Sequence, residues 1–200
     1  MGRRSDHNRE ELEALILDAG REVMAESGYA RFSAREVAKR IGYSVGTVMH
    51  VFGGVDQLVM AINARTFRLW TQWLEDRLEG AQNGDRILVL VHGYFEFATV
   101  HRNLWSAIYE HRLPGGMDMA DTLMAERVHL TDVITREVAS VLTDASTTDT
   151  AKLASSLIAT VHGHCAFLLG GTFALMGVER PVDLAAARVM EVLRANGAMC

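Results

Sequence analysis

The chain has 200 residues, of which 49% are hydrophobic and 22% charged, and it contains only two prolines and two cysteines. This composition argues against a disordered chain and against a disulfide or zinc framework, and it is typical of a helix-rich globular protein. The formal net charge of −5 does not indicate a nucleic-acid-binding protein, so the distribution of charge along the chain matters more than the total.

Residues 30–54 are basic although the whole chain is acidic. This stretch holds four cationic side chains and one anionic side chain, a local charge of 4 − 1 = +3; they are Arg31, Arg35, Lys39, Arg40 and Glu36. Further arginines lie upstream, at Arg3, Arg4 and Arg9. A local basic surface of this kind can bind phosphates in a protein that is acidic overall.

The first predicted helix begins at Asn8, because Glu11 lies three residues later in a capping-box pattern. It carries one apolar face and ends at Gly28. A second capping-box pattern, at Ser33 and Glu36, predicts the start of another helix.

Two short helices follow in close succession. The one that starts at Ser33 ends at Gly42, a residue type that adopts the left-handed conformation found at helix ends. The next is capped by Ser44 and ends at Phe52. Two short helices around a glycine-containing turn form a helix-turn-helix pattern, and neither is long enough to be stable alone.

The rest of the chain is also predicted to be helical. Gly53 and Gly54 break the chain before a long helix over residues 55–78. Further helices are predicted at residues 85–99, 103–111, 119–142, 150–176 and 184–196. No strand alternation is visible, so we expect an all-α fold with a helix-turn-helix domain at residues 1–54 and a larger helical bundle at residues 55–200.

One uncharged segment is long enough to cross a membrane. No Asp, Glu, Lys or Arg occurs from Leu153 to Val178, but serine, threonine, histidine and glycine residues dilute its hydrophobicity. We interpret it as a helix buried in a bundle or in a dimer interface, with no membrane contact. The N-terminus has no apolar secretory core, so we expect a cytoplasmic protein.

The segment from Ser33 to Leu58, SAREVAKRIGYSVGTVMHVFGGVDQL, resembles the helix-turn-helix signature of the TetR family of bacterial regulators. The shared features are the glycine in the turn, the Ser-x-Gly-Thr start of the recognition helix, the aromatic residue at its end, and the acidic residue and leucine that open the fourth helix. The element Val161-His162-Gly163 also resembles part of the ligand domain in a subgroup of this family.

The resemblance implies a homodimer that binds a roughly palindromic double-stranded DNA operator. Its two recognition helices would enter successive major grooves about one helical turn apart. The last two long helices would pair into a four-helix bundle, and a small ligand in the large domain would alter operator affinity. We therefore expect a TetR-like transcriptional regulator, a repressor in our interpretation.

Residues expected to contact DNA follow from the resemblance, position by position. Hydroxyl and backbone N–H groups at a helix N-terminus suit phosphate oxygens, and an arginine fork can bind a guanine edge. The residues are Ser33, Arg35, Ser44, Val45, Gly46, Thr47, Met49 and His50.

Two positions depart from the family pattern. Met49 replaces the usual tyrosine, and Val55 replaces the usual lysine that opens the fourth helix. Both common residues tend to hold phosphates, so we expect weaker DNA binding or more reliance on Arg3, Arg4, Arg35 and Lys39. These departures motivate an alternative, in which the protein is a ligand- or protein-binding module of the same fold with weakened operator binding.

The ligand is expected to be a small apolar or aromatic molecule, because aromatic side chains concentrate in the middle helices. Trp105 and Tyr109 are spaced i, i+4 and so share a helix face. We select them as ligand contacts, followed by His92, Phe95 and His162. Aromatic side chains at helical spacing are more often part of a core than of a pocket.

No catalytic, metal or cofactor site is expected. The sequence contains no nucleophile elbow, phosphate-binding glycine loop or His-Glu-x-x-His pair, so an all-helical enzyme is the least favoured reading. His162 and His164 point about 200° apart on a helix and cannot readily share one metal ion. Cys165 is expected to pack as a small hydrophobic residue.

Overall fold

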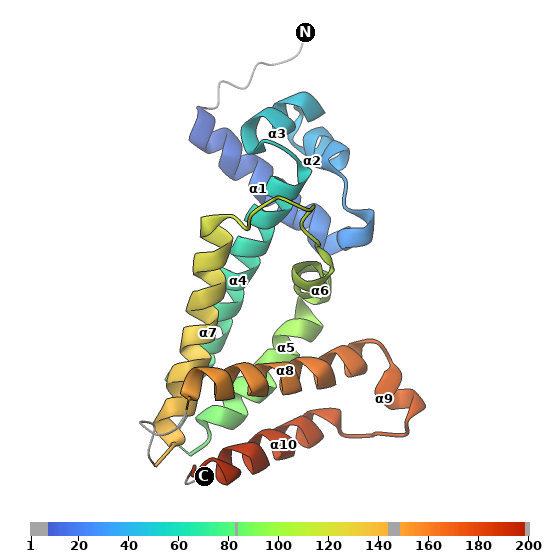
Figure 1. Cartoon of the computed structure of the whole chain (residues 1–200). Helices are drawn as coiled ribbons and strands as arrows, with labels where there is room; N and C mark the ends of the chain where they lie inside the picture. Colours follow the sequence, from blue (N-terminus) through green and yellow to red (C-terminus); the bar gives the residue numbers. More distant parts are fainter. Residues whose placement is uncertain (1–7, 83, 144–148, 199–200) are drawn as a thin grey trace. The chain divides into compact units, whose positions relative to one another are not determined.

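The computed structural model describes residues 8–82, 84–143 and 149–198, which form ten α-helices and one short 3-10 helix. The prediction of an all-α fold is confirmed, since the described residues hold one isolated bridge, between Leu142 and Ala198, and no strand. The helices, shown in Figure 1, are α1 (Arg9–Ser27), η1 (Tyr29–Arg31), α2 (Ala34–Ile41), α3 (Val45–Phe52), α4 (Val55–Glu79), α5 (Arg86–Val100), α6 (Arg102–Glu110), α7 (Asp121–Val141), α8 (Thr150–Leu169), α9 (Thr172–Leu175) and α10 (Pro181–Ala195).

The chain divides into two compact units. The first unit comprises Met1–Phe67 and His101–Glu126, and the second comprises Arg68–Val100 and Arg127–Cys200. This division differs from the predicted boundary between residues 54 and 55. The beginning of α4 and the whole of α6 lie in the first unit with the helix-turn-helix.

Local capping signals set the start of α1. Glu11 N donates to Asn8 Oδ1 over 2.9 Å, and Asn8 N donates to Glu11 Oε2 over 3.0 Å, which is the predicted capping box. Gly28, with φ +72°, ends the helix as predicted. Both ends of α1 therefore follow from residues close in sequence.

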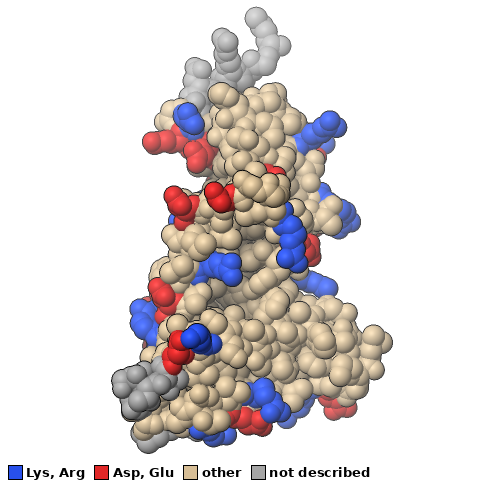
Figure 2. All heavy atoms as spheres, in the orientation of Figure 1, with Lys and Arg blue, Asp and Glu red and all other residues tan. Residues whose placement is uncertain are grey.

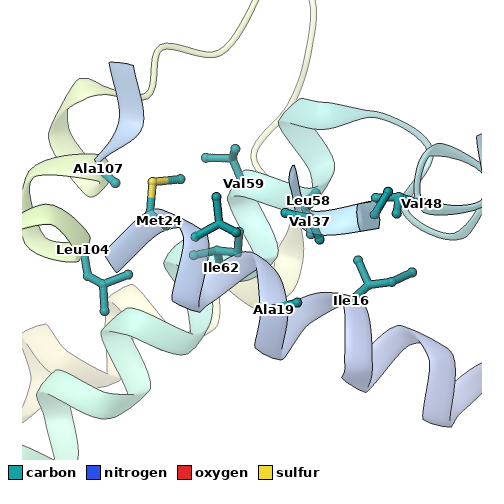
Figure 3. Close-up of a cluster of buried hydrophobic side chains, with 12 residues drawn as sticks. Ile16, Ala19, Met24, Val37, Val48, Leu58, Val59, Ile62, Leu104 and Ala107 are labelled. Atoms are coloured by element: carbon teal, nitrogen blue, oxygen red, sulfur yellow. The ribbon is translucent and has the colours of Figure 1, made fainter. Parts of the chain in front are cut away.

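The core of the first unit holds α2 and α3 against α1, α4 and α6. Ile16 of α1, Leu58 of α4 and Leu104 of α6 are buried in one cluster with residues of the helix-turn-helix (Figure 3). Gly20 allows α1 to approach α4 closely, because a Cβ atom there would lie 3.0 Å from Ile62 Cδ1. Packing of this kind supplies the stability that two eight-residue helices lack by themselves.

Polar contacts attach α6 to the same unit. Asn103 Nδ2 donates to the carbonyl oxygen of Ala25, at the end of α1, over 2.7 Å. His111 Nε2 lies 3.0 Å from Asp56 Oδ1, in the first turn of α4, and the His111 ring packs on Tyr29 at 5.6 Å between centroids. Asp56, the acidic residue in the first turn of α4, thus contacts His111 at the end of α6.

The second unit packs α8 against α10 and α5. Trp70 stacks on Phe97 with ring centroids 4.8 Å apart and meets the edge of Tyr94 at 4.7 Å. Arg86 donates to both carboxylate oxygens of Glu137, over 2.6 and 2.7 Å, which joins the start of α5 to α7. Such a bidentate pair fixes geometry as well as charge.

Two helix boundaries differ from the predictions. The helix expected over residues 150–176 is broken into α8 and α9, because Gly171 adopts a left-handed conformation with φ +76°. The last helix begins earlier than residue 184, since Pro181 occupies its first turn. Proline is tolerated there because the first N–H groups of a helix have no partner within the helix.

By length and composition alone, α8 is the one described helix that could cross a membrane as a single straight segment; α3 and α4 would qualify only as one broken span with a 68° bend. Only 22% of the apolar window in α8 is buried. One face, with Leu157, Val161 and Cys165, lies in the core of the second unit, whereas Phe167 is exposed. The monomer therefore buries less of this helix than the sequence led us to expect.

Burial makes the Cys165 thiol unreactive. The side chain is fully buried, and this burial raises the pKa of the thiol to about 12. Because the thiolate is the reactive form, a Cys200→Ser variant should react with a thiol reagent at pH 7 only as fast as the protein unfolds. Rapid labelling of the folded variant, measured by mass spectrometry, would contradict the packed position of Cys165.

Candidate DNA-binding surface and ligand cavity

The turn between α2 and α3 is built from backbone contacts. Gly42 is left-handed, with φ +75°, and Tyr43 N donates to the Ala38 carbonyl oxygen over 2.9 Å. Ser44 then caps α3, as predicted, by accepting from Thr47 N over 3.1 Å. The Ser44 Oγ and Thr47 Oγ1 atoms lie 2.9 Å apart, so both hydroxyls are held together at the first turn of α3.

The capping box expected at Ser33 does not form. Ser33 is the N-cap residue of α2, but its side chain makes no cap hydrogen bond. Glu36 instead lies 3.9 Å from Lys39 Nζ. The Ser33 hydroxyl therefore remains available to an external acceptor or donor at the start of α2.

The eight predicted DNA contacts fall into two groups by exposure. Arg35, Ser44, Gly46 and His50 are exposed, whereas Ser33, Val45, Thr47 and Met49 are half-buried. Val45 and Met49 pack against the core of the first unit. Both groups belong to α2, α3 and the residues that precede them, so the structure brings all eight into one local segment.

Gly46 is not required by the packing of the first unit. Its backbone has no left-handed conformation, and the nearest atom to an added Cβ would be Ser44 Oγ, at the ordinary contact distance of 3.6 Å. Glycine in a helix costs about 0.5–1 kcal/mol relative to alanine. The absence of a side chain here suits the close approach of another molecule to the backbone of α3.

The basic charge of residues 30–54 is smaller than their composition indicates. Arg40 donates to both carboxylate oxygens of Glu26, over 3.0 and 2.8 Å, and lies 3.5 Å from Glu22. The hydrogen bond to Glu26 also raises the pKa of the Arg40 guanidinium. Both acids lie in α1, which sequence reasoning did not connect with Arg40.

Arg35 is exposed and forms no ion pair with a described residue. Basic and acidic side chains are interspersed over the face in Figure 2, without a continuous basic surface. Val55, in place of a cationic residue, is exposed at the start of α4. Arg3 and Arg4, which we expected to compensate, lie outside the described residues. Among the described residues of this segment, Arg35 is therefore the cation best placed to bind an external anion.

The second unit contains an apolar cavity of about 40 Å³. It lies among α4, α5, α7, α8 and α10, and its lining is Leu74, Ile87, Leu90, Val91, Tyr94, Ile134, Val138, Leu157, Ile158, Val161 and Val189. Ligand pockets in proteins usually enclose about 300–1,000 Å³. A ligand larger than a few atoms would therefore have to widen this cavity.

None of the five predicted ligand residues lines this cavity. Trp105 and Tyr109 do share a face of α6, with ring centroids 5.1 Å apart, but α6 belongs to the first unit. Phe95 is buried in the core of α5, and His92 is exposed. The assignment of Trp105, Tyr109, Phe95 and His92 as ligand contacts therefore stays a prediction, and this cavity does not support it.

One predicted residue, His162, lies within hydrogen-bond distance of a residue of the cavity lining. Its Nδ1 atom lies 3.0 Å from the hydroxyl of Tyr94, and its neighbour Val161 is part of the lining. Sequence reasoning missed the aliphatic lining, because leucine, isoleucine and valine at helical spacing have the same pattern whether they fill a core or surround a cavity.

Partial burial lowers the pKa of His162. An unfolded histidine has a pKa of about 6.5, so the unfolded chain takes up this proton at a higher pH than the folded chain. The free energy of unfolding should therefore fall as the pH is lowered through and below about 6.5. Urea unfolding followed by circular dichroism at several pH values would measure this slope.

A His162→Gln variant should have a smaller slope, because it removes the group that titrates. A His129→Gln variant is the matched control, since His129 is an exposed histidine of α7. His101, whose pKa is lowered by burial and by Arg21, should maintain part of the slope in both variants. An equal slope in the parent and in His162→Gln would contradict the assignment to His162.

The described residues contain no group of three or more His, Cys, Asp or Glu side chains that could hold a metal ion. The two sites that the geometry supports are thus the exposed segment around α2 and α3 and the apolar cavity of the second unit. The first suits contact with an anionic polymer, and the second suits an apolar molecule.

Comparison with known proteins assigns both parts of the chain. Residues 16–62 match the model of the bacterial regulatory proteins of the tetR family, and residues 87–193 match that of the tetracyclin repressor-like C-terminal domain. No curated relative matches the chain.

Solved structures share the fold. A protein of unknown function from Rhodococcus sp. RHA1 has 21% identity and a TM-score of 0.76, with 98% of this chain and 100% of that chain covered. A putative transcriptional regulator from Pseudomonas aeruginosa PAO1 has 19% identity and a TM-score of 0.64, with 95% and 94% covered. The regulator FadR from Bacillus subtilis, solved in complex with stearoyl-CoA, has 14% identity and a TM-score of 0.66, with 90% and 96% covered.

The second family model alone spans more than half of the chain, and the first covers the segment that forms the helix-turn-helix. The chain therefore belongs to the TetR family of bacterial transcriptional regulators.

Proposed function

We propose that this TetR-family regulator is a cytoplasmic repressor, which binds a roughly palindromic operator as a homodimer and is released by a small apolar ligand. The observation that carries the proposal is the start of α3, where the Ser44 and Thr47 hydroxyls and the bare backbone of Gly46 meet at an exposed helix N-terminus. Hydroxyl donors, backbone N–H groups and the helix dipole all favour a phosphate at such a place.

Dimerisation is supported by the surface of the second unit. Four large apolar side chains are exposed in the C-terminal helices. They are Phe167 of α8, Leu175 of α9, Met176 directly after α9, and Leu184 of α10. Figure 2 shows a broad area over α8 and α9 without charged side chains. Exposed apolar patches of this kind mark interaction surfaces, and a twofold dimer would match the symmetry of a palindromic site.

The ligand part of the proposal rests on the cavity among α4, α5, α7, α8 and α10. The FadR structure was solved in complex with stearoyl-CoA, so a protein of related fold binds a ligand that includes a long hydrocarbon chain. A cavity of about 40 Å³ would have to expand around any such ligand, which would move the helices that line it. Movement of this kind is what a ligand needs in order to change operator affinity, because only a ligand that binds the two states differently can shift their populations.

A module with weakened operator binding is a second candidate. Arg40 is paired with Glu26 and Glu22, Met49 packs on the core, and Val55 provides no charge at the start of α4. These three features reduce the number of phosphate contacts available to the first unit. Fewer such contacts predict a weaker affinity and a smaller salt dependence.

Selection of bound sequences from a random duplex pool, at two salt concentrations, tests the proposal. Enrichment of an inverted repeat, with affinity falling as salt rises, would establish a dimeric operator-binding regulator. No enrichment by a folded dimer at either salt concentration would contradict operator binding and favour the second candidate. Addition of a ligand that binds the cavity should then release the enriched duplex.

A further inference from the structure

The cavity of the second unit has one polar position in an otherwise hydrocarbon wall. Ten of its lining residues are leucine, isoleucine or valine, and Tyr94 alone carries a polar side-chain atom. No lining residue is charged. A charged ligand would have to give up its hydration without a counter-charge, which is unfavourable. An apolar molecule with one uncharged polar group matches this wall.

The polar position joins two helices that border the cavity. Tyr94 lies on α5 and its hydroxyl lies 3.0 Å from Nδ1 of His162, on α8. Burial lowers the pKa of His162, so the imidazole is neutral at pH 7 and has one donor and one acceptor nitrogen. A neutral imidazole and a phenol can each donate or accept a hydrogen bond. Tyr94 and His162 can therefore exchange their mutual hydrogen bond for hydrogen bonds to a ligand hydroxyl.

The aromatic ring that packs against Tyr94 carries a buried polar atom. The Trp70 ring meets Tyr94 at a centroid distance of 4.7 Å, and the Trp70 side chain is only 1% exposed. Its Nε1–H group is buried and has no hydrogen-bond acceptor among the described residues. A buried donor without an acceptor is costly, and the aromatic cluster around Tyr94 has one unsatisfied polar group of this kind.

We propose that this cavity binds an uncharged molecule with a hydrocarbon body and one hydroxyl, such as an alkylphenol, and that Tyr94 and His162 recognise the hydroxyl. Entry of the hydroxyl between Tyr94 and His162 replaces their mutual hydrogen bond and separates α5 from α8. The hydrocarbon body widens the cavity among the aliphatic side chains. This inference rests on the proposed ligand-sensing function and names the chemical class that the sensor recognises.

Two probes of matched shape test the assignment on the full-length protein without DNA. 4-Propylphenol carries the hydroxyl, and 4-propyltoluene carries a methyl group in its place. Calorimetry should show tighter binding of the phenol by about tenfold or more, because only its hydroxyl can hydrogen-bond to Tyr94 and His162 in exchange for their mutual hydrogen bond. Since operator binding is measured separately, failure here is distinguishable from failure of the regulator proposal.

The Tyr94→Phe variant should bring the affinity ratio of the two probes close to one, while its affinity for 4-propyltoluene is maintained. His162→Gln should reduce the ratio as well, and it provides a second reading if Tyr94→Phe is poorly folded. Tyr29→Phe, which removes a phenol hydroxyl from the first unit, is the matched control and should leave the ratio unchanged.

Three results would overturn the inference. Equal affinity of the parent for both probes would remove the role of the hydroxyl, while the cavity would remain a site for purely apolar ligands. An unchanged ratio in both Tyr94→Phe and His162→Gln would place recognition elsewhere. Binding of neither probe at millimolar concentration would show that this cavity does not open to molecules of this class.

Discussion

Replacement of Leu58 by alanine is expected to lower the free energy of unfolding by about 2–5 kcal/mol, the usual cost of truncating a fully buried leucine. Leu58 has no exposed surface and belongs to the cluster that holds α1, α2, α3, α4 and α6 together (Figure 3). The loss is a large part of the about 5–15 kcal/mol that stabilises a typical domain. Because α2 and α3 depend on this cluster, operator binding should weaken as well.

Urea unfolding at a fixed protein concentration would measure the change, since dimerisation makes apparent stability depend on concentration. Val100→Ala is the control, because Val100 is 63% exposed and its truncation should change stability by less than about 0.5 kcal/mol. Similar unfolding midpoints for Leu58→Ala and the parent would contradict the central position of Leu58 in the first unit.

The second large effect is expected at the DNA. Arg35→Ala and Thr47→Ala should each cost about 1–3 kcal/mol of binding free energy per lost contact, which is about 5- to 150-fold in affinity. A homodimer would lose the contact in both half-sites, which increases the effect. Thr47→Ala preserves the backbone cap, because the N–H group that donates to Ser44 Oγ belongs to the backbone of residue 47. Both variants should therefore remain folded.

A Gly46→Ala variant distinguishes an effect on DNA binding from an effect on stability more clearly than Arg35→Ala or Thr47→Ala. The added methyl group fits the free protein, and alanine is a better helix former than glycine, so stability should stay equal or rise by up to about 1 kcal/mol. Operator affinity should nevertheless fall, since the methyl group would stand between α3 and the DNA backbone.

Fluorescence anisotropy with the selected duplex would measure the affinities of these variants. Arg127→Ala is the matched control, because Arg127 is an exposed arginine of α7 in the second unit and its loss changes net charge equally. Operator binding as tight as the parent's in Arg35→Ala, Thr47→Ala and Gly46→Ala would refute the proposed DNA surface.

The helix-turn-helix could be predicted because its signals are local. Asn8 and Glu11 cap α1 through each other, Ser44 caps α3, and Gly42 ends α2 in the left-handed conformation. Each of these interactions joins residues at most four positions apart, so the amino-acid order by itself determines them. The same property explains why the family resemblance is concentrated in residues 33–58.

Two local predictions were wrong: the continuous helix over residues 150–176 and the capping box at Ser33. Gly170 and Gly171 were visible, but the uncharged, apolar pattern on both sides favoured one continuous helix over residues 150–176. The structure breaks there, since Gly171 adopts φ +76°. The Ser33 pattern matched a capping box, yet the side chain makes no cap hydrogen bond. A sequence pattern indicates which local interaction can form, and the packing of the surrounding residues determines whether it does form.

Only the tertiary structure decided which distant residues meet. Arg40 looks free to bind an anion in the sequence, but in the structure it pairs with Glu22 and Glu26 of α1. Likewise, α6 belongs to the first unit because Asn103 and His111 bind residues of α1 and α4. The ligand cavity is likewise assembled from five helices whose aliphatic residues look like ordinary core residues in the sequence. The sequence thus determined most of the helices, the caps at Asn8 and Ser44, and the family, because these depend on neighbours along the chain. Packing decided the units, the free charges and the cavity, because these depend on contacts between residues that are far apart in the chain.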